Sequence, residues 1–221
     1  MRHEIKYIFS NDQLSIFMKW MFSKTNFNKK YPDRLVNSIY FDDVFNTSAN
    51  DNLAGISQRE KYRLRWYNIE INNSSNFEIK RKVNKLNSKI YFKLQNKYKN
   101  IFDLSNSEIA YIFQKTIFEY DPKYNFNLFP KLQVQYFRSY FENIKNIRIT
   151  IDKKIQFWSC PEHHKMFYGY KYPYWANIVE IKFEQDCYNY VNDLIRKTTF
   201  LPKRHSKYLA GLATLNEIKY I

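Results

Sequence analysis

The chain has 221 residues and a formal net charge of +15, and 44% of its residues are apolar. This apolar share suffices for a hydrophobic core, so disorder is not expected and one large domain, residues 1–221, is favoured. The positive charge indicates an anionic partner. No run approaches the roughly 18 apolar residues of a membrane span, and the N-terminus lacks the apolar core of a signal peptide. We therefore expect a soluble, cytoplasmic protein with no membrane span.

Glycine and cysteine usage excludes several common sites. The three glycines are Gly55, Gly169 and Gly211, and neither GxGxxG nor GxxxxGK can be written with them, which excludes Rossmann and P-loop phosphate cradles. Cys160 and Cys187 lie far apart without CxxC spacing, so we expect free thiols. A protein of this kind that handled phosphates would have to bind them with side-chain cations.

In the first half of the chain, alternation and capping signals predict mainly strands. We expect a strand over 2–9, a helix from a cap at Ser10 to about residue 22, a loop at 31–33, a strand over 36–41, a helical or irregular piece before Gly55, and a hairpin of strands 59–67 and 77–83 around a polar turn at 71–76.

In the second half, periodicity predicts a mixture of helices and strands. The segment 85–99 is basic and ambiguous. We expect helices over 105–118, 187–197 and 210–218, strands over 131–142, 147–152 and 178–183, and an extended basic segment over 201–208.

The strand over 59–67 has the most distinctive pattern. Its alternate positions are Arg59, Lys61, Arg63 and Arg65, separated mostly by aromatic and aliphatic residues. Alternation places these four cations on one face, about 6.5–7 Å apart. Because like charges repel, such a row favours a partner with regularly spaced negative charges, such as a phosphate chain. The alternative is a half-buried strand with an ordinary solvated basic face.

At least five strands share this design, including the strand over 59–67, and each has a charged and an aliphatic face. The charged positions are Glu4 and Lys6, Glu78, Lys80 and Lys82, Arg148 and Asp152, and Glu180 and Lys182. A closed antiparallel barrel with a charged lumen and outer helices fits this pattern. We predict that Arg63, Arg65, Lys80, Arg148 and Lys182 face one shared cavity and that Leu64, Ile79, Ile149 and Ile181 point away from it.

A series of short motifs, nearly end to end, resembles a known family. The motifs are Arg2-x-Glu4-x-Lys6-Tyr7, Asn37-Ser38-Ile39-Tyr40-Phe41-Asp42, Lys61-Tyr62-Arg63-Leu64-Arg65-Trp66-Tyr67, Glu78-x-Lys80, Tyr136-x-Arg138, Arg148-x-Thr150-x-Asp152, Glu180-x-Lys182 and Ser206-Lys207-Tyr208. In this order they resemble the VTC domain, the polyphosphate-polymerase branch of the triphosphate tunnel metalloenzymes, or CYTH-like superfamily, in its stand-alone bacterial type. In the wider superfamily the first strand opens with Glu-x-Glu-x-Lys, whereas here the first of these positions is Arg2.

The resemblance implies an α+β fold in which a closed eight-stranded antiparallel β-barrel, with flanking helices, holds a triphosphate or polyphosphate. The implied catalytic cations are Arg63, Arg65, Arg138 and Lys207. The implied phosphate-binding residues are Lys6, Lys80, Lys89, Arg148, Tyr136 and Ser206, and the strand pattern adds Arg59, Lys61, Lys82 and Lys182. Glu180 is implied as the ligand of Mn²⁺ or Mg²⁺, with Glu78 as a second metal candidate.

The implied reaction is transfer of the γ-phosphate of ATP to a growing polyphosphate chain. A metal-dependent triphosphatase, with water as the nucleophile, would use the same cations, although their surplus over carboxylates favours the polymerase. The third alternative is a non-catalytic binder of polyphosphate or nucleic acid. Nucleic acid is disfavoured because its binding surface should be an open basic stripe.

Overall fold

The computed structural model describes residues 2–68, 75–84, 86–93, 101–120, 122 and 127–219. Its strands are β1 (Arg2–Phe9), β2 (Asn28–Asp42), β3 (Gln58–Tyr67), β4 (Asn76–Val83), β5 (Leu86–Lys93), β6 (Phe129–Glu142), β7 (Arg148–Ser159), β8 (Tyr172–Pro173) and β9 (Asn177–Glu184). Its helices are α1 (Asn11–Lys24), α2 (Thr47–Leu53), α3 (Asn106–Tyr120), α4 (Tyr188–Arg196) and α5 (Lys207–Thr214), with short 3-10 turns at Ile101–Asp103 and Gln185–Cys187.

The chain forms two compact units. The first unit comprises Met1–Leu35, Tyr136–Ile155 and Pro173–Ser206, and the second comprises Val36–Gln135, Gln156–Tyr172 and Lys207–Ile221. That the whole chain acts as one domain stays a prediction. Among the described residues, no helix is both long and apolar enough to cross a membrane.

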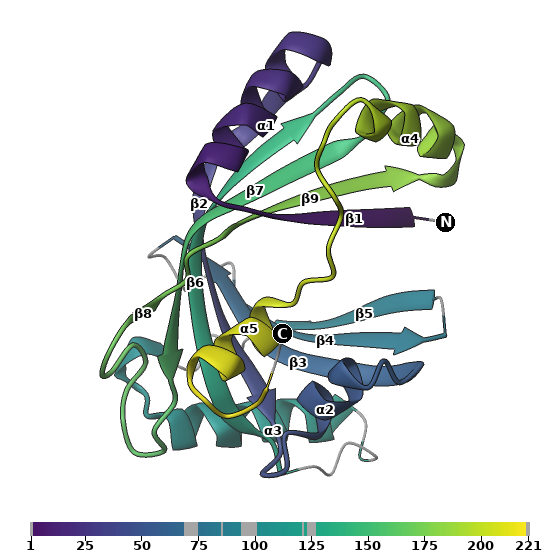
Figure 1. Ribbon diagram of the computed structural model, residues 1–221. Helices are drawn as coiled ribbons and strands as arrows, with labels where there is room; N and C mark the ends of the chain where they lie inside the picture. Colours follow the sequence, from purple (N-terminus) through teal and green to yellow (C-terminus); the bar gives the residue numbers. More distant parts are fainter. Residues whose placement is uncertain are drawn as a thin grey trace. The chain divides into compact units, whose positions relative to one another are not determined.

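In the first unit, α1 and α4 pack on the apolar face of β1, β9 and β7 (Figure 1). Strand β9 pairs antiparallel with both neighbours, which places Tyr7, Val179 and Ile151 in one cross-strand row of this core. Helix α1 begins at the predicted cap: the Ser10 hydroxyl accepts from the Gln13 backbone N–H, and the Gln13 side chain accepts from the Ser10 N–H. This capping box satisfies two backbone donors that the helix itself cannot.

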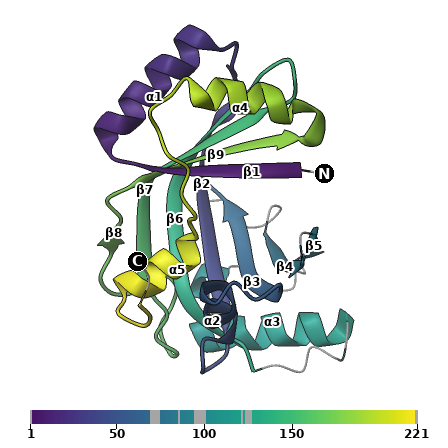
Figure 2. The same cartoon turned by 45° about the vertical axis from the view of Figure 1, so that its right-hand side comes forward.

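In the second unit, α3 packs on the apolar face of β2, β3, β4 and β5 (Figure 2). One row of this core runs across all four strands and consists of Ile39, Leu64, Phe77 and Phe92. Helix α3 contributes Phe113, whose ring stacks on that of Phe41 with centroids 4.0 Å apart. The predicted hairpin of β3 and β4 is confirmed.

The predicted closure of the sheet into an eight-stranded barrel is wrong. The strands hydrogen-bond in the order β1-β9-β7-β6-β2-β3-β4-β5, with β8 pairing with β7 off this path. Strands β1 and β5 end this order, and no ladder joins them within the part of the chain that the structure describes. Alternation determines which side chains share a face, but it does not specify whether the first and last strands pair. Each unit instead closes its own apolar core with its own helices.

Several boundaries differ from the sequence predictions, including that of β7, which runs to Ser159 rather than to residue 152. The expected loop at 31–33 belongs to β2, where Pro32 lies in the exposed first part of the strand, a position that tolerates a missing N–H donor. The last helix runs over Lys207–Thr214 rather than 210–218. The expected turn at 71–76 falls largely on residues 71–74, and the basic segment 85–99 partly on 94–99, both outside the described residues.

Helix α5 lies unusually close to the strands beneath it, and Gly211 permits this approach. A Cβ atom at this position would meet the buried side chain of Leu132 and lie 3.0 Å from Phe157 Cδ1. We expect Gly211→Ala to destabilise the protein by about 1 kcal/mol, because an overpacking cost of about 1–3 kcal/mol exceeds the helix-propensity gain of about 1 kcal/mol. Urea unfolding measures the change. Leu132→Val in the same chain should recover part of it, and a more stable Gly211→Ala protein would contradict the close approach.

Candidate functional site

On the first unit, the sheet face opposite the core carries two carboxylates and two ammonium groups in alternation. Lys6 lies opposite Glu180, and Glu4 lies opposite Lys182, on the paired strands β1 and β9. Lys6 Nζ is 2.8 Å from Glu4 Oε1 and 3.7 Å from Glu180 Oε1, and Lys182 Nζ is 2.9 Å from Glu180 Oε2 and 3.8 Å from Glu4 Oε2. Each charge therefore has two opposite neighbours, which offsets the repulsion between the lysines.

The environment of Glu180 stabilises its ionised form. Burial raises the pKa of this carboxyl, but Lys182, a hydrogen bond with Glu4, Lys6 and Arg138 together hold it well below its usual value. The hydroxyl of Thr150, which lies opposite Glu180 on β7, is buried and has no hydrogen-bond partner among the described residues.

A second charged group of the first unit lies on β6 and β7. Arg138 donates from Nε to Asp152 Oδ1 at 2.6 Å and from Nη2 to Oδ2 at 2.8 Å, a bidentate pair. The guanidinium also lies 5.2 Å from the ring centroid of Tyr136. Burial opposes the charge on Arg138, yet Asp152 raises its pKa well above the usual value. Its guanidinium plane is therefore held by a carboxylate and an aromatic ring.

Two predicted residues of the first unit remain, Arg148 on β7 and Ser206 at the end of the unit. Arg148 lies opposite Lys182, but its side chain is 56% exposed and pairs with Glu142 at 3.1 Å. The predicted extended segment before α5 follows β1: the Lys203 N–H donates to the Lys6 carbonyl, and Lys6 Nζ donates to the His205 carbonyl at 3.3 Å. Ser206 ends this segment and the unit.

On the second unit, Arg63 lies at the centre of a row of side chains across four strands. Tyr40 on β2 and Glu78 on β4 flank it, and Tyr91 on β5 follows Glu78. Arg63 donates to Glu78 Oε2 from Nε at 2.8 Å and also from Nη2. Burial raises the pKa of Glu78, but Arg63, Arg65 and Lys89 lower it overall. The carboxylate thus orients Arg63 and compensates its charge.

The neighbouring row on the same face consists entirely of lysines. Lys61, Lys80 and Lys89 lie opposite one another on β3, β4 and β5, and such cross-strand neighbours have Cβ atoms roughly 5 Å apart. On the far side of this row, Arg59 lies opposite Lys82 and donates to the Ile56 carbonyl. Five cations therefore lie in two adjacent rows of this face, namely Arg59, Lys61, Lys80, Lys82 and Lys89.

Arg65 and Lys207 complete the cations of the second unit. Arg65 is only 8% exposed and donates from Nε to Ser38 Oγ at 3.2 Å. Lys207 begins α5, and the next residue, Tyr208, donates its hydroxyl to Asp42 Oδ2 at 2.7 Å. Burial raises the pKa of Tyr40, but Arg63, Arg65 and Lys207 lower it overall. All three cations therefore act on the phenol group of Tyr40.

The structure thus divides the predicted site residues between the units. The first unit holds Lys6, Tyr136, Arg138, Arg148, Glu180, Lys182 and Ser206. The second holds Arg59, Lys61, Arg63, Arg65, Glu78, Lys80, Lys82, Lys89 and Lys207. The prediction of opposite faces is confirmed, since Leu64 and Ile79 are buried in one core and Ile149 and Ile181 in the other. That Arg63, Arg65, Lys80, Arg148 and Lys182 share one cavity stays a prediction.

Comparison with protein families assigns the chain. The profile of the VTC domain matches residues 1–216. The chain belongs to the VTC domain family. No curated protein matches the sequence.

Three solved structures share the fold of this VTC domain. They are the PH1819 protein from Pyrococcus horikoshii OT3 (14% identity, 97% of this chain and 98% of that one, TM-score 0.52), a putative adenylate cyclase from Vibrio parahaemolyticus (12%, 97% of each, 0.52), and the putative adenylyl cyclase HpAC1 from Hippeastrum, reported to have a dominant triphosphatase activity (9%, 96% of each, 0.57). At such identities the likeness shows the fold alone.

Three residues of the VTC domain's charged faces were absent from the predicted site. Glu4 contacts both Lys6 and Lys182, Asp152 holds Arg138, and Tyr40 lies beside Arg63. Glu4 and Asp152 could have been found from their alternation with the cations. Tyr40 gives no such signal, because an aromatic residue in a strand usually belongs to the core.

The donor set of the first unit fits a divalent cation better than that of the second. No cluster of three His, Cys, Asp or Glu side chains occurs in the described part of the chain, but Mg²⁺ typically uses one or two carboxylates together with water and substrate phosphates. Glu4 and Glu180, with the unpartnered Thr150 hydroxyl beside them, offer such a set. Glu78 is already engaged by Arg63, so its metal role stays a prediction with less support.

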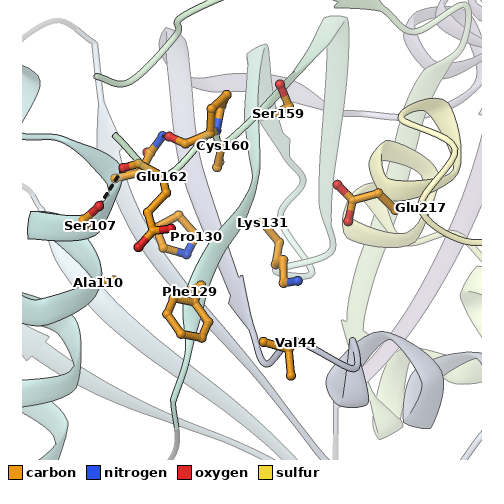
Figure 3. A pocket seen from close by; sticks show the side chains of 12 residues that line it. Val44, Ser107, Ala110, Phe129, Pro130, Lys131, Ser159, Cys160, Glu162 and Glu217 are labelled. Carbon is orange, nitrogen blue, oxygen red and sulfur yellow. Dashed lines mark hydrogen bonds between the residues drawn. The ribbon is translucent and has the colours of Figure 1, made fainter. Parts of the chain in front are cut away.

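A separate pocket of about 450 Å³ lies elsewhere in the second unit (Figure 3). Its charged residues are Lys131, Glu162 and Glu217, and its walls include the apolar side chains of Phe129 and Pro130. With two carboxylates and one ammonium group, this pocket has the opposite charge balance from the cationic sheet faces. It contains none of the predicted phosphate ligands.

The Arg63–Glu78 pair makes the stability of this VTC domain depend on pH. Because the pKa of Glu78 is lowered from its usual 4.5, the contribution of the pair is fully present above that pH and is lost as the pH falls through the lowered value. We expect Glu78→Gln to cost about 3 kcal/mol at neutral pH, since it leaves a largely buried guanidinium without its carboxylate. The difference from wild type should shrink as the pH falls below 4.5 and through the lowered pKa of Glu78, where the wild-type carboxyl also becomes neutral.

The matched control for this test is Glu60→Gln. Glu60 pairs with Arg81, whose side chain is 41% exposed, so its loss should cost about 0–1 kcal/mol. Urea unfolding between pH 3 and 8 compares the variants. Equal costs for the two substitutions would contradict the role assigned to Glu78.

Proposed function

We propose that this VTC domain is a metal-dependent polyphosphate polymerase that transfers the γ-phosphate of ATP to a growing polyphosphate chain. The observation that carries the proposal is that Arg63, Arg65 and Lys80 lie on one sheet face of the second unit, where a row of three lysines adjoins the Arg63 row. Lys207, at the start of α5, acts together with Arg63 and Arg65 on Tyr40 of this face. A face of this kind suits a linear polyanion with closely spaced charges. Membership of the VTC domain family supports the same assignment.

Phosphoryl transfer requires positioning and charge neutralisation more than covalent chemistry from the protein. In the proposed reaction, a terminal phosphate oxygen of the polyphosphate chain attacks the γ-phosphorus of ATP, the bond from that phosphorus to the β,γ-bridging oxygen breaks, and ADP leaves. Planar guanidinium groups can hold two phosphate oxygens at once. Arg63 and Arg138 suit this role because Glu78 and Asp152 fix the planes of their guanidinium groups.

The proposed metal site consists of Glu4 and Glu180. Bound Mn²⁺ or Mg²⁺ supplies positive charge and Lewis acidity toward phosphate oxygens. Lys6 and Lys182 now contact these two carboxylates. When the carboxylates hold a cation, the two ammonium groups are available to phosphate oxygens nearby.

A tri- or polyphosphatase is the second candidate function. The observation in its favour is the shared fold with HpAC1 from Hippeastrum, a protein reported to have a dominant triphosphatase activity. The same cations would hold the substrate, and water would replace the terminal phosphate as the nucleophile. The cation surplus, +15 for the chain, favours a second polyanion over water as the acceptor.

Incubation of the purified chain with ATP and Mn²⁺ distinguishes the candidates. We expect ADP and a polyphosphate ladder on a gel. If free phosphate formed without polymer, the protein would be a phosphatase rather than a polymerase. If neither polymer nor free phosphate formed, it would be a non-catalytic binder. Glu180→Gln should abolish the metal-dependent turnover while tripolyphosphate still binds, because the cations remain. Full activity of Glu180→Gln in Mn²⁺ would contradict the proposed metal site.

Substitution of Arg65 tests whether the second unit grips phosphate with guanidinium geometry. Arg65→Lys keeps the charge but replaces a planar fork with a point contact. A charge-assisted hydrogen bond in a partly desolvated site is worth about 1.5–3 kcal/mol, so we expect tripolyphosphate binding to weaken roughly tenfold or more. Calorimetric titration at fixed ionic strength provides the measurement.

The control for this test is Arg81→Lys. Arg81 lies on the neighbouring strand, but on the opposite parity to Lys80, and pairs with Glu60. Its replacement should leave tripolyphosphate affinity within about twofold of wild type. If both variants bound as tightly as wild type, Arg65 would be a structural residue that does not contact phosphate.

A further inference from the structure

The motif over residues 37–42 is explained by its alternate side chains. Ile39 and Phe41 enter the core of the second unit, whereas Ser38, Tyr40 and Asp42 project to the cationic face. Ser38 accepts from Arg65, and Asp42 accepts from Tyr208. Both of these residues therefore position groups of the cationic face, which leaves the role of Tyr40 to be explained.

Tyr40 is a buried residue that lies beside cations. Its side chain is 8% exposed, its cross-strand neighbour is Arg63, and Arg63, Arg65 and Lys207 all favour a negative charge at its phenol oxygen. A neutral phenol beside a guanidinium has a hydrogen to donate, which the cation itself cannot accept. A ligand atom that accepts the Tyr40 hydrogen would lie next to Arg63 and Arg65. It is most stable there if it is anionic, because the two cations attract it in addition to the hydrogen bond.

Tyr40 is also held rigidly. Its ring stacks on that of Tyr208 in α5, with centroids 5.0 Å apart and planes 17° from parallel. Tyr208 is fixed by its hydrogen bond to Asp42, and Asp42 accepts in turn from the backbone N–H groups of Ser48 and Ala49 in α2. A donor fixed in this way loses little conformational freedom when a ligand binds.

We propose that Tyr40 is a phosphate-binding residue, whose hydroxyl donates a hydrogen bond to a phosphate oxygen held by Arg63, Arg65 and Lys207. This inference rests on the proposed function of the same face. In this role Tyr40 selects ligands that place an anionic oxygen close to both arginines. The non-bridging oxygens of an inorganic phosphate chain meet this requirement.

The cations around Tyr40 connect this role to pH. Burial raises the pKa of the phenol, but Arg63, Arg65 and Lys207 hold it below its usual value of 10. Only the neutral phenol can donate, and the phenolate would repel phosphate. Affinity should therefore be highest below the pKa of Tyr40 and fall as the pH rises through it. The other groups that face Tyr40 are Tyr208 and, beyond Arg63, Glu78.

The experiment compares the tripolyphosphate affinities of wild type and Tyr40→Phe by calorimetric titration from pH 7 to pH 10. At pH 7 we expect Tyr40→Phe to bind about tenfold more weakly. As the pH approaches 10, the affinity of wild type should fall toward that of the variant. Titration of lysines and of the ligand is common to both proteins, so their ratio isolates the phenol of residue 40.

Tyr91→Phe is the matched control. Tyr91 lies on the same row, but Glu78 separates it from Arg63, so its loss should leave the affinity and its pH dependence unchanged. If wild type and Tyr40→Phe bind tripolyphosphate equally well over the whole pH range, this inference is overturned. The proposed function then stays intact. Failure of wild type to bind tripolyphosphate overturns the proposed function itself. Thermal unfolding of Tyr40→Phe at pH 7, expected within a few degrees of wild type, excludes a general loss of structure as the cause.

Discussion

The strict alternation of side chains in a β-strand is the constraint on which this structure depends. In each unit the same strands supply an apolar core on one face and a charged surface on the other, so the position of every cation is coupled to the packing of its neighbours. A slip of β3 by one residue would bury Arg63 and expose Leu64, which is fully buried. The helices α1, α3 and α4, by covering the apolar faces, therefore also position the charged ones.

Concentrated like charges require compensation, and the charged faces provide it in three ways. Arg138 has its own buried carboxylate, Asp152, in a bidentate pair. Lys6 and Lys182 share two carboxylates in an alternating arrangement. Arg63 is held by Glu78, whereas the adjoining row consists only of lysines. Since like charges directly opposite one another destabilise a sheet, we expect a bound polyanion to stabilise this part of the second unit.

The sequence predicts faces well and closure poorly. Alternation correctly separated Arg63 and Lys80 from Leu64 and Ile79, because the period of a strand is a local property. Whether the end strands pair is a long-range property with no local signal, so the barrel prediction failed. The partners Glu4 and Asp152 were visible in the alternation. The role of Tyr40 was not visible in the sequence, because an aromatic residue in a strand usually belongs to the core. Only the pairing with β3 shows that cations lie beside it.

The small α5 helix shows how a site can depend on packing that is distant from its charges. Gly211 lets α5 approach Leu132 and Phe157, and this approach accompanies the hydrogen bond from Tyr208 to Asp42. Asp42 in turn accepts from backbone N–H groups of α2, so it joins two helices to β2. Because Lys207 directly precedes Tyr208, the same contact that supports the ring of Tyr40 also fixes the start of the helix that carries Lys207. A cation and a hydroxyl donor are thereby positioned by one buried carboxylate that need not touch a ligand.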